Sequence, residues 1–203
     1  MNTSRAIDIL TTRVASTLGL GLGLCAGCAA YVPVASNVSI AHCELRRSPT
    51  PAQASTFLDS WKGAVHDAAL SVASTCEHFT DVFSIGRKPP SRVRGEVTLH
   101  LRHRGEKLCV QYGLFLDGQV SLRLDRIERT GQGQKELSHR ECELLVETLF
   151  AMAALAAFPQ LDLADPDAYR KDLGARIELL TRNAPFDRDP WTRVRELAAR
   201  RSK

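Results

Sequence analysis

The chain has 203 residues, of which 44% are hydrophobic and 25% are charged, a composition typical of a globular protein with an apolar core. Its formal charge is +4, and +3 remains beyond residue 27, an excess too small to indicate a nucleic-acid-binding surface. The 176 residues after position 27 correspond to one domain.

The N-terminal segment has the organisation of a secretory signal peptide. Arg5 and Arg13 precede a short apolar run over 14–26, in which leucine alternates with glycine. A basic region, a short apolar region and small residues before the cleavage site define such a signal. The run is shorter than the roughly 20 residues of a membrane-spanning helix, and we expect no later stretch to span a bilayer.

The residues that end this run, Cys25-Ala26-Gly27-Cys28, resemble the lipobox of bacterial lipoproteins. Ala26, Gly27 and Cys28 match its usual form, whereas Cys25 stands where leucine is usual. The resemblance implies removal of residues 1–27 and acylation of Cys28 with chains such as palmitate. Because Ala29 is not aspartate, it also implies the periplasmic face of the outer membrane. The alternative is a plain secretory signal cleaved slightly later, which would discard Cys28.

The mature chain is predicted to contain a tether, one folded domain and a basic tail. Residues 28–37 are mostly small, and the pattern of strands and helices runs over 38–183. The remaining segment, 184–203, carries six basic residues from Arg188 to Lys203 and the start of a further helix.

The domain is predicted to begin with a strand and a long helix. Alternating apolar residues predict a strand over 38–45. Thr-Pro-Ala-Gln at 50–53 has the form of a helix start with a capping box, and apolar residues at steps of three and four extend the helix to about residue 78. A short strand is expected at 82–85, before a basic, proline-rich loop at 87–92.

The clearest pattern lies over 95–128, where three apolar runs alternate with polar residues. A turn at Arg104-Gly105 and a hairpin signal at Asp117-Gly118 separate the runs, which predicts an antiparallel meander with one apolar face. A slip of one residue would expose that whole face, so the register is predicted as well. The residues of the middle strand expected to be buried are Leu108, Val110, Tyr112, Leu114 and Leu116.

Two amphipathic helices follow and are predicted to cover the apolar face. Ser138 and Glu141 form a capping-box pattern before a helix that stops ahead of Pro159. A second helix begins at Asp165-Pro166. The predicted fold class is α+β, a single domain in which an antiparallel β-meander sheet packs against α-helices.

Four cysteines remain beyond the acylated one: Cys43, Cys76, Cys109 and Cys142. An even number in an exported chain favours disulfides, and four cysteines allow three connectivities. We expect Cys43–Cys76, which would join the first strand to the end of the first helix. The alternatives are buried thiols and a metal site, because His42, His78 and His139 lie near cysteines, although in no standard zinc spacing.

Candidate catalytic side chains form no known pattern in this sequence. His66 and Asp67 are adjacent on the predicted helix and should point apart, and His100 and His103 fall on opposite faces of a strand. There is no Gly-x-Ser-x-Gly, no His-Glu-x-x-His and no phosphate-binding glycine loop. We therefore expect no catalytic residues, no metal site and no cofactor.

Two basic segments are the candidate contact surfaces, with an ordinary solvated surface as the alternative for both. The first surrounds the proline-rich loop and comprises Arg87, Lys88, Arg92 and Arg94. The second lies in the tail and comprises Trp191, Arg193 and Arg195. Their expected partner is an anionic lipid head group or an acidic protein, not nucleic acid.

The sequence therefore predicts a lipid-anchored envelope protein that acts as a non-catalytic binding or assembly factor with a protein partner. Its element order is similar to that of small helix-on-sheet envelope lipoproteins that assist transport or assembly complexes. The alternatives are a periplasmic hydrolase with dispersed catalytic residues and a lipoprotein that handles metal through cysteine and histidine.

Overall fold

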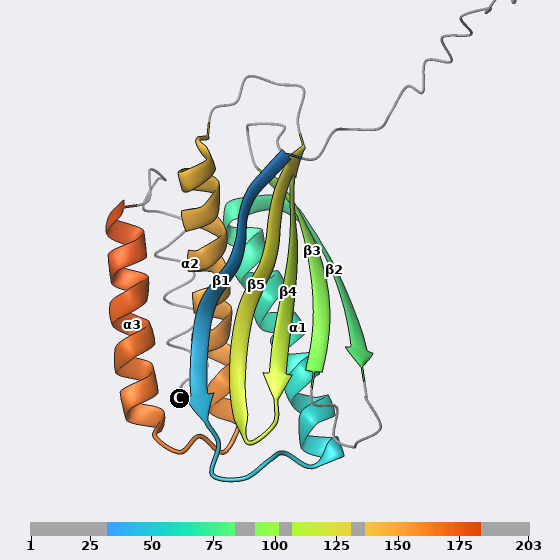
Figure 1. Ribbon diagram of the computed structural model, residues 1–203, viewed down its shortest axis with the longest axis vertical. Coiled ribbons are helices and arrows are strands. Elements are labelled where there is room, and N and C mark those ends of the chain that lie inside the picture. Colours follow the sequence, from blue (N-terminus) through green and yellow to red (C-terminus); the bar gives the residue numbers. More distant parts are fainter. Residues whose placement is uncertain (1–31, 84–91, 102–106, 131–136, 184–203) are drawn as a thin grey trace, which may run out of the picture.

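The computed structural model describes residues 32–83, 92–101, 107–130 and 137–183. Within these residues the chain forms a sheet and a set of helices (Figure 1). The elements, in chain order, are β1 (Val32–Glu44), α1 (Pro51–Val72), β2 (Ala73–Phe83), β3 (Arg92–Leu101), β4 (Lys107–Leu116), β5 (Gln119–Thr130), α2 (His139–Ala157), the short 3-10 helix η1 (Phe158–Gln160) and α3 (Pro166–Asn183).

The sheet has five strands in the order β1-β5-β4-β3-β2, and every neighbouring pair is antiparallel. The three strands β3, β4 and β5 form the predicted meander, and β1 and β2 add to its two opposite edges. Helix α1 connects these two edge strands behind the sheet (Figure 1). The arrangement confirms the predicted α+β class.

The register predicted for the middle strand is confirmed. The five even-numbered side chains named above are each at most 1% exposed, whereas Lys107 and Gln111 on the other face of β4 are exposed. Cys109 and Gly113 on that other face are also buried, so the contrast is weaker at these two positions. The even-numbered face packs against the helices, which place Trp61 and Phe150 against Tyr112, and Phe158 packs against Trp61.

Local capping residues define where the helices begin. Thr50 donates its backbone N–H to Gln53 Oε1 at 2.9 Å, and Ser138 and Glu141 form the reciprocal capping box of α2. Helices α1 and α2 cover one face of the sheet, and α3 packs against α2 beside β1 (Figure 1). The other face carries no helix among the described elements.

One helix contradicts the expectation that no later stretch could span a membrane. The segment His139–Gln160 is long and apolar enough to do so by length and composition. However, 78% of its apolar window is buried inside the domain, as expected for the core helix of a globular protein.

Three predicted boundaries were wrong. Strand β1 begins at Val32, inside the predicted tether, because Val32 already pairs with Arg129 of β5. Helix α1 ends at Val72, and β2 occupies 73–83, where we had expected helix to about residue 78 and a strand at 82–85. Pairing along β3 makes this segment a strand, and such long-range pairing overrides local periodicity. The further helix expected in the tail lies outside the described residues.

Candidate functional site

The face of the sheet opposite the helices carries mostly polar side chains. On β3 it presents Arg94, Glu96 and Thr98, whose neighbours along the strand point into the core. Polar side chains on one face of an antiparallel sheet are typical of a face that meets solvent or a partner.

Arginines and one aromatic ring form a patch at the end of this face where β3 begins and β4 ends. The Cζ atoms of Arg92 and Arg123 lie 4.9 and 5.9 Å from the centre of the Phe115 ring. Arg94 is placed beside them because its register partner, Gly113, also pairs with Arg123. We call these four residues, Arg92, Arg94, Phe115 and Arg123, the arginine patch.

The chemistry of the arginine patch suits a carboxylate-bearing partner. A guanidinium that stacks on an aromatic ring keeps its N–H groups available at its edge, where they can donate two parallel hydrogen bonds to a carboxylate. Arg123 donates from Nε to Asp125 Oδ1 at 2.7 Å, so part of its charge is already balanced. The buried Nε of Arg92 has no partner within the part of the chain that the structure describes.

The patch contains two of the residues predicted from sequence, Arg92 and Arg94. Arg87 and Lys88 lie outside the described residues, as do Trp191, Arg193 and Arg195. Sequence reasoning missed Phe115 and Arg123. The signal was present, because Phe115 is a large aromatic residue among the odd-numbered positions of a strand whose apolar face is even-numbered.

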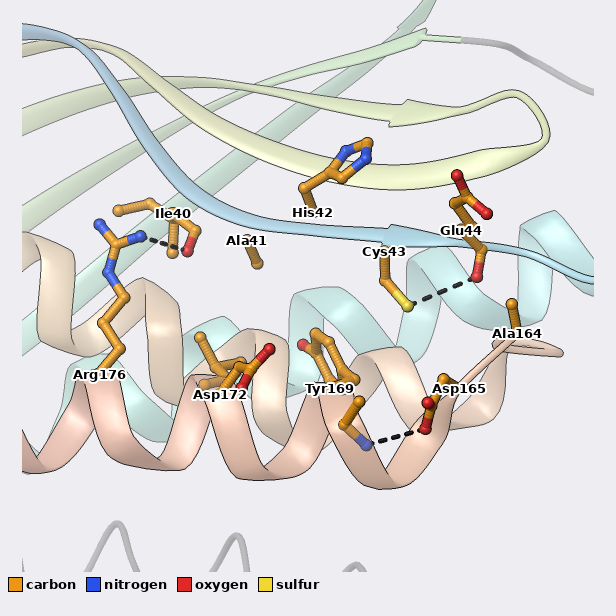
Figure 2. A pocket seen from close by; sticks show the side chains of 12 residues that line it. Ile40, Ala41, His42, Cys43, Glu44, Ala164, Asp165, Tyr169, Asp172 and Arg176 are labelled. Atoms are coloured by element: carbon orange, nitrogen blue, oxygen red, sulfur yellow. Dashed lines mark hydrogen bonds between the residues drawn. The ribbon is translucent and has the colours of Figure 1, made fainter.

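A groove of about 380 Å³ lies between β1 and α3 (Figure 2). Its apolar walls include Ile40, Ala41 and Leu173. Figure 2 shows Cys43 pointing from β1 toward α3, whereas the adjacent His42 points away from it. The groove was not predicted, because it depends on how α3 lies against the sheet edge.

Backbone and side-chain bonds close the groove at both ends. At one end Arg176 donates from Nη1 to the carbonyl of Ile40 at 2.8 Å, and its Nη2 lies 3.3 Å from Oε2 of the buried Glu147. At the other end Ala164 donates its N–H to the carbonyl of Glu44 at 2.9 Å. The outer edge of β1 is thus engaged on both sides of the groove.

Titratable groups line the groove between these ends. Burial raises the pKa of the Tyr169 hydroxyl, which belongs to a side chain only 6% exposed and has no hydrogen-bond partner among the described residues. Desolvation also raises the pKa of the Cys43 thiol, which donates to the Glu44 carbonyl at 3.4 Å. Asp165 immediately precedes α3 and accepts from the N–H of Ala168 at 2.9 Å, and Asp172 lies two turns further along.

The sheet order does not bring the expected disulfide partners together. Cys43 lies on β1 and Cys76 on β2, at opposite edges of the sheet. Four strand spacings of roughly 4.8 Å separate these edges by about 19 Å, whereas a disulfide requires Cα atoms within about 7 Å. The Cys43–Cys76 bridge therefore does not fit this fold. Cys43, Cys109 and Cys142 form no disulfide within the described part of the chain.

Among the described residues the candidate metal ligands and the candidate acid–base pair His66–Asp67 do not assemble into a site. Buried Cys142 lies beside Arg129, whose Nη1 is 3.9 Å from its sulfur. His66 and Asp67 are closer than adjacency on a helix predicts, with Nδ1 4.0 Å from Oδ1, which is too long for a hydrogen bond. Within the described ranges no three His, Cys, Asp or Glu residues gather into a possible metal site. His103 lies outside those ranges.

No protein-family model, no curated protein and no solved structure matches this chain. A function must therefore be inferred from the arginine patch, the groove and the place of Cys28 in the sequence.

Proposed function

We propose that this chain is a lipid-anchored envelope protein that acts by binding an acidic partner protein through the arginine patch. Two features support this function: the lipobox resemblance at Cys28, and the direction in which the sheet extends away from that residue. The observation that carries it is the separation between the start of β1 and the arginine patch.

The anchor and the sheet are separated by very little chain. Val32 begins β1 four residues after Cys28. Because an extended chain spans at most about 3.6 Å per residue, this connection reaches no further than about 14 Å. An acyl group on Cys28 would therefore hold the end of the sheet at which β1 begins close to the bilayer.

The arginine patch lies toward the other end of the sheet. Phe115 pairs with Ser121 of β5, and Ser121 pairs with His42 of β1, ten residues along the strand from Val32. At about 3.3 Å per strand residue, this row is roughly 33 Å from the start of β1. A patch so far from the anchored end favours a protein partner in the periplasm over the head groups of the membrane that holds the anchor.

Charge and geometry together indicate the partner's chemistry. Arg92 and Arg123 beside the Phe115 ring, with Arg94 near them, attract a surface rich in aspartate and glutamate. Such attraction raises the association rate and weakens with added salt. Of the two expected partners, an acidic protein is therefore favoured over lipid head groups.

The test is chemical cross-linking of the lipidated full chain in its own membranes, followed by identification of the cross-linked protein. The variant Arg94→Glu/Arg123→Glu reverses two charges of the patch. The matched control, Arg170→Glu/Arg182→Glu, reverses two exposed arginines on α3. We expect an acidic partner that the patch variant loses, that the control retains, and whose yield falls as salt rises.

Two outcomes would overturn the proposal. If the patch variant and the control capture the same partner equally, the contact surface is elsewhere. If the chain binds vesicles containing anionic lipid through the patch and captures no acidic protein, the ligand of the patch is lipid.

A further inference from the structure

We propose that the groove between β1 and α3 binds a small organic cation, an ammonium group carried on a short apolar body. This site is separate from the arginine patch, and the inference does not depend on the acidic partner.

An extended peptide does not fit this sheet edge. The outward carbonyls of Ile40 and Glu44 are already bonded to Arg176 and to the N–H of Ala164. Further along β1, Asn37 adopts a positive φ of 57°, and the register shifts twice against β5. Irregularities of this kind protect edge strands from pairing with another strand. A compact ligand remains, and about 380 Å³ is the volume of a small-molecule site.

The charges that face the groove select a cation. Asp165 and Asp172 supply carboxylates to its lining, whereas the carboxylate of Glu44 points away from it, as His42 does (Figure 2). The lining guanidinium, Arg176, lies within ion-pair distance of Glu147 outside the groove. Asp172 has no ion-pair or hydrogen-bond partner among the described residues, so its carboxylate is available to a ligand.

Tyr169 is an independent indication of a ligand. Its side chain is 94% buried against the groove, and its hydroxyl has no partner within the described part of the chain. Figure 2 shows its ring between Cys43 and Asp172. Buried polar groups in folded proteins are almost always hydrogen-bonded, so an unpaired hydroxyl beside a groove calls for a missing partner.

An ammonium ion satisfies both groups at once. It has three donors, which can bond to the Asp172 carboxylate and to the Tyr169 hydroxyl oxygen. An attached apolar body would then pack against Ile40, Ala41 and Leu173, which line the same groove. Neither an anion nor a neutral alcohol supplies the charge that Asp172 requires.

The test is a ligand-observed NMR titration of the full chain with n-butylammonium, compared with butyrate and with 1-butanol. We expect saturable binding of the ammonium ion and at least about tenfold weaker binding of the other two. N-acetyl-lysine methylamide carries the same group on a peptide backbone. If it binds more tightly than butylammonium, the natural ligand is a protein lysine; if it binds more weakly, the natural ligand is a free amine.

Two variants probe the groups that carry the inference. Asp172→Asn should weaken butylammonium binding about threefold to fivefold, whereas Asp167→Asn, on the same helix outside the groove, should leave it unchanged. Tyr169→Phe should weaken binding without lowering the unfolding midpoint, because it removes a hydroxyl that is unpaired in the free protein. Butyrate binding as tightly as butylammonium, unchanged binding in Asp172→Asn, or no saturable binding of the ammonium ion would each overturn the inference.

Discussion

The ring of Tyr112 on β4 lies directly against Gly95, its register partner on β3. A Cβ atom placed on Gly95 would lie 2.1 Å from Cζ of the tyrosine. The tyrosine hydroxyl accepts a hydrogen bond from Nε1 of Trp61 on α1, at 3.0 Å. The missing side chain at one strand position thus makes room for a ring that ties the first helix to the middle of the sheet.

Gly95→Ala should therefore destabilise the domain. The new methyl group would force the Tyr112 ring away from its position and from Trp61, and overpacking of this kind costs about 1–3 kcal/mol. Urea unfolding measures the change. Gly174→Ala is the control, because a Cβ there meets nothing within 4 Å in the middle of α3. It should raise the free energy of unfolding by roughly 0.5–1 kcal/mol, and equal effects from the two substitutions would refute the explanation.

Arg176→Met should cost more stability than removal of an exposed arginine. The substitution would remove the guanidinium that donates to the carbonyl of Ile40. The buried Glu147 would then keep one arginine nearby, Arg140, whose Nη1 lies 3.7 Å from its Oε1. Breaking a buried ion pair typically costs about 3–5 kcal/mol, and the remaining arginine places the expected loss near the lower end.

The matched variant is Arg182→Met, which removes an exposed partner of Glu178. Surface pairs contribute about 0–1 kcal/mol, so this variant should unfold close to the parent chain. Thermal and urea unfolding of both variants decide the point. A loss below 1 kcal/mol for Arg176→Met would show that the Glu147 contact is not structural.

The thiol of Cys109 should be unreactive in the folded protein. Burial, followed by the hydrogen bond to Glu96 and the charge of that residue, raises its pKa to about 12. Because the thiolate is the nucleophile, alkylation at pH 9 should be roughly 500-fold slower than in the urea-unfolded chain. The folded pKa is the higher one, so the thiol form stabilises the fold at neutral pH. That contribution is lost as pH rises from the unfolded value toward 12.

Residue-resolved alkylation measured by mass spectrometry tests this prediction. Glu96→Gln removes the charge that opposes ionisation and should speed the reaction of Cys109. Glu178→Gln on α3 is the control and should leave the rate unchanged. A Cys109 that reacts as fast when folded as when unfolded would contradict the assigned pKa direction.

Cys28→Ala should release the protein from the membrane or leave its signal peptide uncleaved. Two or more acyl chains anchor a protein stably, and this substitution removes the residue expected to carry them. Mass spectrometry of the mature N-terminus gives the decisive measurement. An unmodified N-terminus that begins at or after Ala29 would rule out the anchor and, with it, the orientation proposed for the arginine patch.

The sequence by itself determined the meander and the starts of the helices. The alternation of apolar residues over 108–116 and the Asp117-Gly118 turn depend on neighbours in the chain, and Gly118 does adopt a positive φ of 65°. The capping boxes at Thr50 and Ser138 are equally local. These features were predictable because each is stabilised within a few residues.

Only the tertiary structure decided the sheet edges and the two candidate sites. Val32 pairs with Arg129, nearly a hundred residues away. Residue 73 belongs to β2 and pairs with β3, although its local pattern continues a helix. Strand pairing over such distances depends on which sheet edges remain free and which face the helices cover. The local periodicity of the sequence predicts neither of these. The same long-range choices set Cys43 far from Cys76, brought Arg123 to Phe115, and left the groove in which Tyr169 is buried.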